Sequence, residues 1–266
     1  MGVNKNHKIA IVHDWFITVG GAEKVLSQLL AIYPDAVVFC LFDFFDENAR
    51  KKVLRGKKTK RSFLQWFPFA KRFYRFLIPV FYKSIEKLNL SEFDLIISSS
   101  HAVAKNIQKT NNQVHICYCH TPMRYVWNMK KTYVNQLPLF LRGFAFRRFN
   151  RMKNWDLEST KRVDHFIANS NFVAGRIEKN YNRKATVIHP PVNTEFFTLP
   201  ENSDYSPSSS PYFLVVSRLV KYKRVDLVVK SFNNQPDKKL IIIGDGPHLK
   251  ELQRMSNENI EFINFQ

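Results

Sequence analysis

A regular alternation of short apolar runs with helical patterns most strongly constrains the fold of this chain. Residues 9–12 form a continuous apolar run, typical of a parallel strand buried on both faces. Val25, Leu26, Leu29 and Leu30 then recur on one helical face. Further strands are predicted at 36–41, 94–100, 114–119, 165–170 and 185–189. Such strand–helix repetition predicts an α/β fold with a doubly wound parallel sheet.

A polar segment divides the chain in two. Residues 199–211 are rich in Ser, Pro, Asn and Asp, as in an exposed linker. Beyond it, strands are predicted at 212–217, 240–244 and 260–265, with helices at 225–232 and 248–255. We therefore expect a complete domain over 1–198 and a partial one over 212–266. Three parallel strands leave an exposed edge and little core, so the chain is expected to be truncated at its C-terminal end.

The charge of the chain indicates an anionic partner. Lys and Arg number 41 against 22 Asp and Glu, a net charge of +19. Nucleic acid, an anionic membrane surface and phosphorylated substrates all fit this charge. No recognised RNA- or DNA-binding motif accompanies it, so a nucleic-acid-binding protein is the weaker alternative.

The cysteines and the N-terminus point to a cytoplasmic protein. Cys40, Cys117 and Cys119 are odd in number and lack metal-binding spacing, so reduced, buried thiols are expected. Residues 1–8 do not fit a signal peptide, and no uncharged apolar run of about 18 residues is present.

A basic and aromatic segment at 50–88 suggests contact with a membrane surface. In its part at 61–82, Phe69, Phe73, Phe76, Leu77 and Val80 share one helical face, and Lys71, Arg72 and Arg75 lie off it. This composition is typical of a helix lying in a membrane interface. A core-packing helix with a solvated basic side is the alternative, and stacking on single-stranded nucleic acid is a weaker one.

Candidate functional residues follow the ends of predicted strands, where open parallel sheets bind their ligands. Gly20 and Gly21 precede a helix whose free N–H groups favour an anion, although a plain tight turn explains them too. His120 follows the 114–119 strand, and a structural histidine is the alternative there. Arg124 could bind phosphate or pair with an acid across the loop.

The strongest pair is Arg218 and Lys223, just beyond the 212–217 strand. A forked guanidinium and a compact ammonium can together hold a departing diphosphate. The alternative is a solvated basic face, because Lys221 and Arg224 are also present. The glycine-rich stretch 244–247 predicts a strand-to-helix turn.

Several motifs occur in one order along the chain, namely H-D-W, G-G-A-E, S-S-S-H-A-V-A-K, C-H-T-P-M-R-Y-V-W, F-I-A-N-S-N-F-V-A, V-I-H-P-P-V, S-R-L-V-K-Y-K-R-V-D and I-G-D-G-P. In this order they resemble the two-domain glycosyltransferases of the GT-B fold, family 4. The resemblance is to bacterial mannosyltransferase-type members that build lipopolysaccharide O-antigen or capsule.

The resemblance implies two Rossmann-like domains, the N-terminal one complete and the C-terminal one partial. It implies retaining transfer of a hexose from a nucleoside-diphosphate sugar, with GDP-mannose the first expectation, to a polyprenyl-diphosphate-linked glycan. The protein would work at the inner face of the cell membrane, on an anionic surface, without nucleic acid. No cofactor or metal is expected, and the chain has no Asp-x-Asp motif.

The resemblance also implies roles for single residues. His120 would assist at the donor sugar, and Arg218 and Lys223 would neutralise the leaving diphosphate. The expected substrate-binding residues are Asp14, Gly20, Gly21, Arg124, Gly244, Asp245 and Gly246. The family's two downstream glutamates, eight positions apart, are absent. We therefore expect weak donor binding and no transfer by this chain alone, and an inactive fragment that keeps the acceptor- or membrane-binding half remains an alternative.

Overall fold

The computed structural model describes residues 7–68, 70–73, 78–128, 134–135, 138–198 and 211–264. The chain forms two compact units, Met1–Asn193 and Thr194–Gln266. Of the predicted linker, only Pro211 lies within the described residues. In the predicted membrane segment, residues 69 and 74–77 and the side chains of 72–79 lie outside them.

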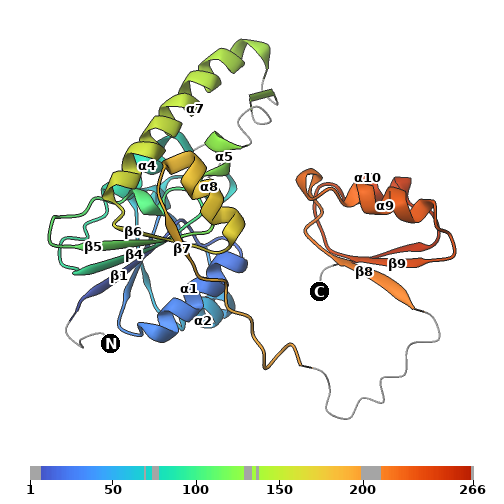
Figure 1. Ribbon diagram of the computed structural model, residues 1–266, viewed down its shortest axis with the longest axis horizontal. Coiled ribbons are helices and arrows are strands. Elements are labelled where there is room, and N and C mark those ends of the chain that lie inside the picture. The colour runs from blue at the N-terminus through green and yellow to red at the C-terminus, as the bar shows by residue number, and fades with distance from the viewer. Residues whose placement is uncertain are drawn as a thin grey trace. The chain divides into compact units, whose positions relative to one another are not determined.

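A seven-stranded sheet, with all its strands parallel, forms the centre of the N-terminal unit (Figure 1). The strand order is β3-β2-β1-β4-β5-β6-β7. The strands are β1 (Ile9–His13), β2 (Val37–Cys40), β3 (Thr59–Arg61), β4 (Leu95–Ser100), β5 (Val114–Cys119), β6 (His165–Ala168) and β7 (Ala185–Val187). The order reverses between β1 and β4, and ligands of doubly wound sheets bind at such a switch point.

The helices of this unit connect successive strands. The α-helices are α1 (Gly21–Ile32), α2 (Glu47–Leu54), α3 (Ala70–Phe73), α4 (Ile78–Glu86), α5 (Arg124–Trp127), α7 (Leu139–Ser159) and α8 (Asn171–Tyr181). Short 3-10 turns lie at η1 (Phe63–Trp66), η3 (Ala104–Asn106) and η4 (Thr160–Arg162). The sequence patterns predicted α1 and α8 but neither β3 nor the long α7.

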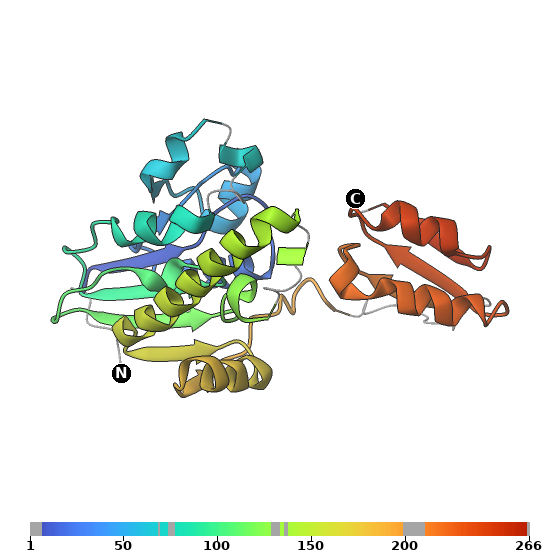
Figure 2. The same ribbon diagram turned by 90° about the horizontal axis from the view of Figure 1, so that it is seen from above.

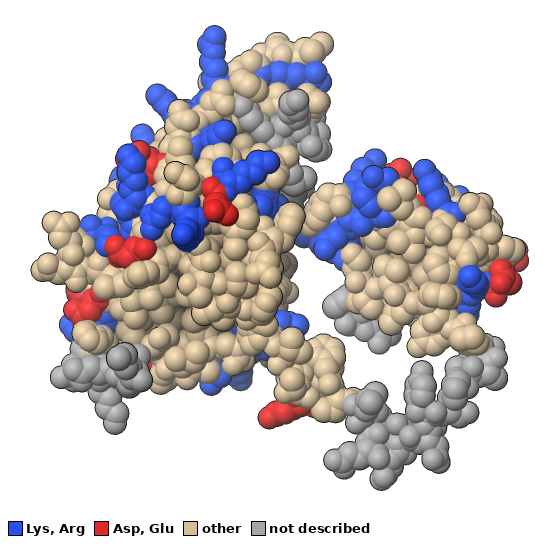
Figure 3. Space-filling view, viewed as in Figure 1, with Lys and Arg blue, Asp and Glu red and all other residues tan. Residues whose placement is uncertain are grey.

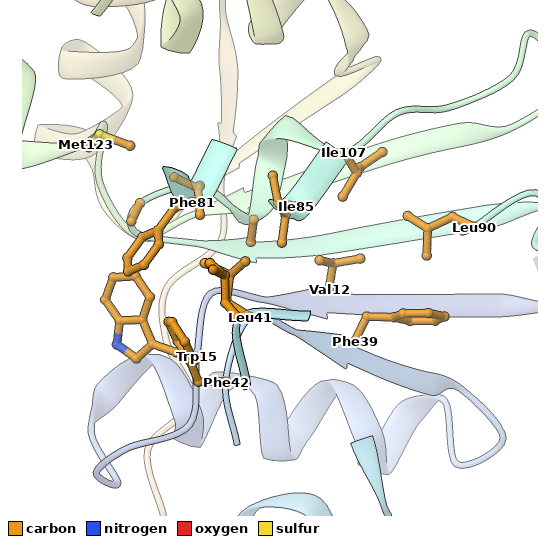
Figure 4. Packing of buried hydrophobic residues seen from close by; sticks show 14 of the residues in the cluster. Val12, Trp15, Phe39, Leu41, Phe42, Phe81, Ile85, Leu90, Ile107 and Met123 are labelled. Atoms are coloured by element: carbon orange, nitrogen blue, oxygen red, sulfur yellow. The ribbon is translucent and has the colours of Figure 1, made fainter. Parts of the chain in front are cut away.

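Helices cover both faces of this sheet, as the alternation along β1 shows. Ala10 and Val12 pack into a cluster with residues of α4 and α7, whereas Ile11 packs into a second cluster with residues of α1 and α2. Figure 4 shows the first cluster, and Figure 2 shows α7 passing over the sheet. All three β1 residues are fully buried, which confirms the prediction of a strand covered on both sides.

A smaller parallel sheet of order β10-β9-β8 forms the C-terminal unit. Its elements are β8 (Tyr212–Val216), η5 (Lys221–Lys223), α9 (Val225–Asn233), β9 (Lys239–Ile243), α10 (Leu249–Met255) and β10 (Ile260–Ile263). Leu240 and Ile242 of β9 pack with Val229 of α9 and Leu252 of α10. Tyr212, Leu214 and Val216, alternate residues on one face of β8, remain 53%, 51% and 58% exposed, so the described helices cover mainly the other face of this sheet.

The three cysteines are free thiols and all are buried, as predicted. Cys117 and Cys119 both pack into the cluster that includes residues of α8, because alternate residues of a strand face the same side. Within the described part of the chain, none of the helices has the length and apolar character needed to span a bilayer.

Candidate active site

A cavity of about 360 Å³ lies at the carboxyl edge of the N-terminal sheet. It is lined by residues at the start of α1 and in the loops after β4 to β7, namely Gly21, Ala22, His101, His120, Thr121, Arg124, Asn169 and Pro190. The structure thus brings together three residues that the sequence singled out, Gly21, His120 and Arg124. Two further cavity residues, His101 and Asn169, were not predicted. Both follow strand ends, so the rule that open parallel sheets bind ligands at the carboxyl ends of their strands would have identified them.

The two glycines before α1 have different surroundings. Gly20 is the N-cap of α1, and its N–H donates to Glu23 Oε2 at 2.8 Å. A Cβ atom on Gly20 would lie 3.0 Å from that oxygen, which is tighter than ordinary contact. A Cβ on Gly21 would meet no atom within 4 Å. Gly20 therefore accommodates the returning Glu23 side chain, and Gly21 lines the cavity.

His120 is held on three sides. Its Nε2 lies 2.9 Å from Ser99 Oγ, and its backbone N–H donates to the carbonyl of Ser100 at 2.9 Å. Its own carbonyl accepts from Asn169 Nδ2 at 3.1 Å. Burial, with the charges of His13 and His101, lowers the pKa of His120 to about 3. The imidazole is therefore neutral at physiological pH, with one nitrogen able to accept a hydrogen bond.

Asp14 is a structural anchor. It is fully buried, and its oxygens accept the backbone N–H groups of residues 101–104 at 2.5 to 3.0 Å. His101 Nδ1 lies 3.0 Å from the same carboxylate. Burial raises the pKa of Asp14, but the charge of His101 and its hydrogen bonds outweigh burial and hold that pKa well below the usual range. Because these donors occupy the carboxylate, Asp14 does not offer it to a substrate, contrary to the expectation from the sequence. Asp14 instead positions the loop that carries His101.

Arg124 carries a charge that the described acids do not neutralise. Arg124 is the first residue of α5, and its side chain is exposed at the cavity. None of the acidic residues in the described ranges forms an ion pair with it, so pairing with an acid across the loop is not observed. Burial and then the nearby charge of Arg124 lower the pKa of Arg176. This excess of positive charge favours an anionic group at this end of the cavity.

In the C-terminal unit, the loops after β8 and β9 are locked together. Leu219 N–H donates to the Asp245 carbonyl at 2.8 Å, and the carboxylate of Asp245 accepts from Gly246 N–H at 2.6 Å. A Cβ on Gly244 would lie 1.9 Å from the Ser217 carbonyl oxygen, and one on Gly246 would lie 2.2 Å from that of Leu219. Both glycines are therefore required for this close approach. The turn fixes the backbone beside Arg218.

The four cations after β8 fall into two classes. Lys221 pairs with Glu251 at 3.3 Å, and Arg224 pairs with Asp226 at 3.1 Å. Arg218 and Lys223 are exposed, and no acid among the described residues forms an ion pair with either. Lys221 and Arg224 therefore fit the alternative interpretation, a solvated basic face. Arg218 and Lys223 remain available to an external anion. Across the residues that the structure describes, no three His, Cys, Asp or Glu side chains are grouped to hold a metal ion.

Family models match both units. Residues 19–196 match the model described as Glycosyltransferase Family 4, and residues 201–266 match the model described as Glycosyl transferases group 1. The first match alone covers more than half of the chain. No curated protein sequence matches the chain.

Solved structures share the fold at low sequence identity. Anabaena Alr3699/HepE, in complex with UDP and glucose, superposes with a TM-score of 0.62 at 16% identity over 98% of this chain and 70% of that one. The lipopolysaccharide outer core galactosyltransferase WaaB gives 0.52 at 19% identity over 97% and 68%. S. aureus TarM gives 0.54 at 11% identity over 97% and 78%. The two parallel α/β units are therefore those of the GT-B fold.

Proposed function

The chain belongs to glycosyltransferase family 4, and from this membership we propose that it transfers a hexose from a nucleoside-diphosphate sugar to a lipid-linked glycan. The anomeric configuration is retained, GDP-mannose is the donor, and a polyprenyl-diphosphate-linked glycan of a cell-surface polysaccharide is the acceptor. The observation that carries the proposal is the pair of unpaired cations, Arg218 and Lys223. The solved complex of HepE with UDP-glucose supports the same class of donor.

The reaction breaks the bond between the anomeric carbon and the diphosphate oxygen. An acceptor oxygen forms the new bond to that carbon, and its proton passes to the departing diphosphate. Negative charge develops on the departing diphosphate. The guanidinium of Arg218 binds two of its oxygens, and the ammonium of Lys223 adds a point charge. Preplaced cations lower the barrier because they interact most strongly with the charge that forms in the transition state. In this scheme the two cationic side chains stabilise the negative charge on the diphosphate that a divalent metal ion would otherwise stabilise.

The cavity of the N-terminal unit serves the sugar and the acceptor. Neutral His120 offers a hydrogen-bond acceptor to a sugar hydroxyl, and Gly21 leaves space beside it. Arg124 supplies positive charge for an anionic group of the acceptor, whose diphosphate is the obvious candidate. In the other unit, the turn formed by Gly244, Asp245 and Gly246 lies beside the cations and contacts the nucleotide.

Transfer is tested with a version of the chain extended to carry the family's two downstream glutamates, because transfer by the 266-residue chain alone is not expected. We expect GDP release from GDP-mannose to depend on an added polyprenyl-diphosphate-linked glycan, with slower release from UDP-glucose under the same conditions. Nucleotide release is followed by a coupled assay, and the lipid product by mass spectrometry. Faster acceptor-dependent release from UDP-glucose would show that mannose is the wrong sugar. If none of the nucleotide sugars supported acceptor-dependent release, the proposed reaction would be wrong.

We further propose that the enzyme works on an anionic membrane surface at the inner face of the cell membrane. In the described part of segment 61–82, Phe63, Trp66 and Phe67 are 55%, 77% and 50% exposed. The guanidinium of Arg61 lies 5.5 Å from the centroid of the Trp66 ring. Exposed aromatic rings beside cations are typical of a surface that enters the headgroup region.

A second surface that supports this proposal is the N-terminal part of α7. Leu139, Phe140 and Phe144 are 78%, 82% and 66% exposed, and they precede the basic residues Arg147, Arg148 and Arg151. Figure 1 shows α7 extending beyond the body of its unit, and Figure 3 shows Lys and Arg side chains along this region. Leu64 of η1 and Met152 of α7 pack into the same cluster, so both surfaces lie over the same face of the sheet.

Removing charge from α7 should weaken vesicle binding. Arg147 and Arg151 are exposed and one helical turn apart. Since each cation near an anionic surface contributes about 1 kcal/mol, Arg147→Gln with Arg151→Gln is expected to weaken binding by roughly tenfold or more. Co-sedimentation with vesicles containing an anionic lipid, at low and high salt, measures this effect. The control is Lys230→Gln with Lys250→Gln, which removes the same charge from exposed positions of α9 and α10, in the unit to which no membrane surface is assigned. Equal weakening by both double variants would show that net charge alone explains binding.

A further inference from the structure

A second cavity of the N-terminal unit, also of about 360 Å³, lies at the β3 edge of the sheet. It is lined by residues of β3 and the start of η1, and by residues at the end of α4 and in the loop that follows. These segments lie far apart in the sequence, so tertiary packing forms the cavity. None of its lining residues belongs to the cavity that contains His120, and the proposed transfer reaction does not use it.

The side chains of this second cavity carry an excess of positive charge. Three cations line it, and one of them, Lys60, lies 3.3 Å from the carboxylate of Glu92, which also lines it. The other two, Arg61 and Lys87, are exposed, and no acid in the described ranges forms an ion pair with either. Two positive charges at this cavity are therefore not neutralised by the protein, and this favours an anionic ligand.

The uncharged polar groups of the cavity leave hydrogen-bond donors for a ligand. The hydroxyls of Ser62 and Ser84 each donate to a backbone carbonyl at 3.0 Å, so their protons are already used. Asn89 Oδ1 accepts from both the N–H and the hydroxyl of Ser91. The NH2 group of Asn89 has no hydrogen-bond partner within the described part of the chain. A guanidinium, an ammonium and an amide NH2 therefore remain for a ligand, and all three are donors.

Aromatic rings lie beside both unpaired cations. Lys87 Nζ lies 5.4 Å from the ring centroid of Phe63, which also lines the cavity, and the guanidinium of Arg61 lies 5.5 Å from that of Trp66. Phe63 and Trp66 belong to the exposed aromatic surface that enters the headgroup region in the proposed function. The cavity is therefore continuous with that surface. With these rings in the headgroup region, the two cations lie at the depth of the lipid phosphates.

We propose that this cavity binds the phosphate headgroup of one anionic phospholipid. The guanidinium of Arg61 donates to two phosphate oxygens, the ammonium of Lys87 adds a point charge, and the NH2 group of Asn89 donates to a further oxygen of the headgroup. The lipid is a bound ligand here and not a substrate. The choice of a lipid over a soluble phosphate compound rests on the proposed membrane surface, whereas the binding of a phosphate group does not.

The test uses dihexanoyl-phosphatidylglycerol, a short-chain lipid kept at concentrations where it is monomeric, and the full 266-residue chain. Isothermal titration calorimetry should show saturable binding of one lipid molecule. Dihexanoyl-phosphatidylcholine should bind much more weakly, because its choline group cancels the phosphate charge. Inorganic phosphate should also bind more weakly than the anionic lipid, because it makes no contact with the ring of Phe63.

Lys83 provides a matched control for Lys87. It is exposed on α4, one helical turn before Lys87, and does not line the cavity. Lys87→Gln should weaken binding of the monomeric anionic lipid by about fivefold or more, the scale for losing a charged hydrogen-bond donor at a partly exposed site. Lys83→Gln removes the same charge and should leave the affinity unchanged. Arg61→Lys keeps the charge but loses the forked geometry, so it should also weaken binding.

The proposal is overturned if the monomeric anionic lipid does not bind, if phosphatidylcholine binds as tightly, or if Lys83→Gln and Lys87→Gln have equal effects. An unchanged affinity in Arg61→Lys would also overturn it. If inorganic phosphate bound as tightly as the lipid, the cavity would serve soluble phosphate compounds and the lipid assignment would be wrong. Transfer is not measured, so the result does not depend on the sugar or the acceptor. If the monomeric lipid bound as expected but vesicles did not, the proposed membrane surface would fail and the cavity would stand.

Discussion

In the extended version used for the transfer assay, replacing either Arg218 or Lys223 by Ala is expected to lower turnover by at least about 100-fold, the scale typical for losing one group that stabilises transition-state charge. Both side chains are exposed and lack an acidic partner among the described residues, so their charge remains available for the leaving diphosphate. The measurement is kcat for acceptor-dependent nucleotide release at saturating donor. Thermal unfolding should be unchanged, because neither side chain contributes to the buried cluster of this unit.

Lys221→Ala is the matched control for this experiment. Lys221 lies in the same short turn as Lys223, and its ammonium pairs with Glu251 at 3.3 Å. Its removal deletes one positive charge from the same loop but no group assigned to the diphosphate. We expect turnover close to that of the wild-type chain. Near-normal turnover of both Arg218→Ala and Lys223→Ala, or an equal loss in Lys221→Ala, would show that the two cations do not form a diphosphate clamp.

The buried strands could be predicted because a parallel strand covered on both faces must be apolar at every position. This is the pattern of residues 9–12, and the structure buries Ala10, Ile11 and Val12 fully and Ile9 partly. β3 could not be found in this way, since Thr59, Lys60 and Arg61 form a short polar strand at the edge of the sheet. α7 was missed for a related reason. Phe140 and Phe144 at its N-terminal part are exposed rather than packed, so apolar residues do not mark one inward face.

The site was partly predictable because the carboxyl ends of parallel strands meet at one edge. That rule places Gly21, His120 and Arg124 together, and the structure brings all three to one cavity. The contacts that hold these residues could not be predicted. Asp14 accepts from backbone groups 87 to 90 positions away, and Ser99 lies 21 positions from His120. Such pairings depend on strand order and register, which no local pattern specifies.

Asp14→Asn is expected to lower the free energy of unfolding by about 3–5 kcal/mol, the scale for removing one partner of a buried ion pair. The fully buried carboxylate accepts four backbone N–H groups and faces His101. An Asn side chain has the same shape, but its NH2 group would meet N–H donors where the carboxylate had an acceptor. For a unit of this size, the loss corresponds to a decrease in Tm of roughly 6–20 °C.

The pH dependence of stability gives an independent test of the same pair. The pKa of Asp14 is lowered, so its contribution is complete above the ordinary carboxyl range and is lost as the pH falls below that range. Burial lowers the pKa of His101, but the charge and hydrogen bond of Asp14 outweigh burial and raise it. The contribution of His101 is therefore complete below the ordinary imidazole pKa and is lost as the pH rises through the raised value. The free energy of unfolding of the wild-type chain should therefore be highest between these two pH ranges. In Asp14→Asn it should fall less than in the wild-type chain as the pH drops below the carboxyl range and as it rises above the imidazole range.

Glu158→Gln provides the matched control for Asp14→Asn. Glu158 pairs with Lys161 at 2.9 Å, but the two side chains are 62% and 72% exposed. Water already solvates both groups and salt screens them, so the neutral variant should unfold at the wild-type temperature across the same pH range. Thermal unfolding followed by circular dichroism measures all three proteins. If Asp14→Asn unfolded like Glu158→Gln, or kept the pH profile of the wild-type chain, the buried carboxylate would not be the anchor of the loop that carries His101.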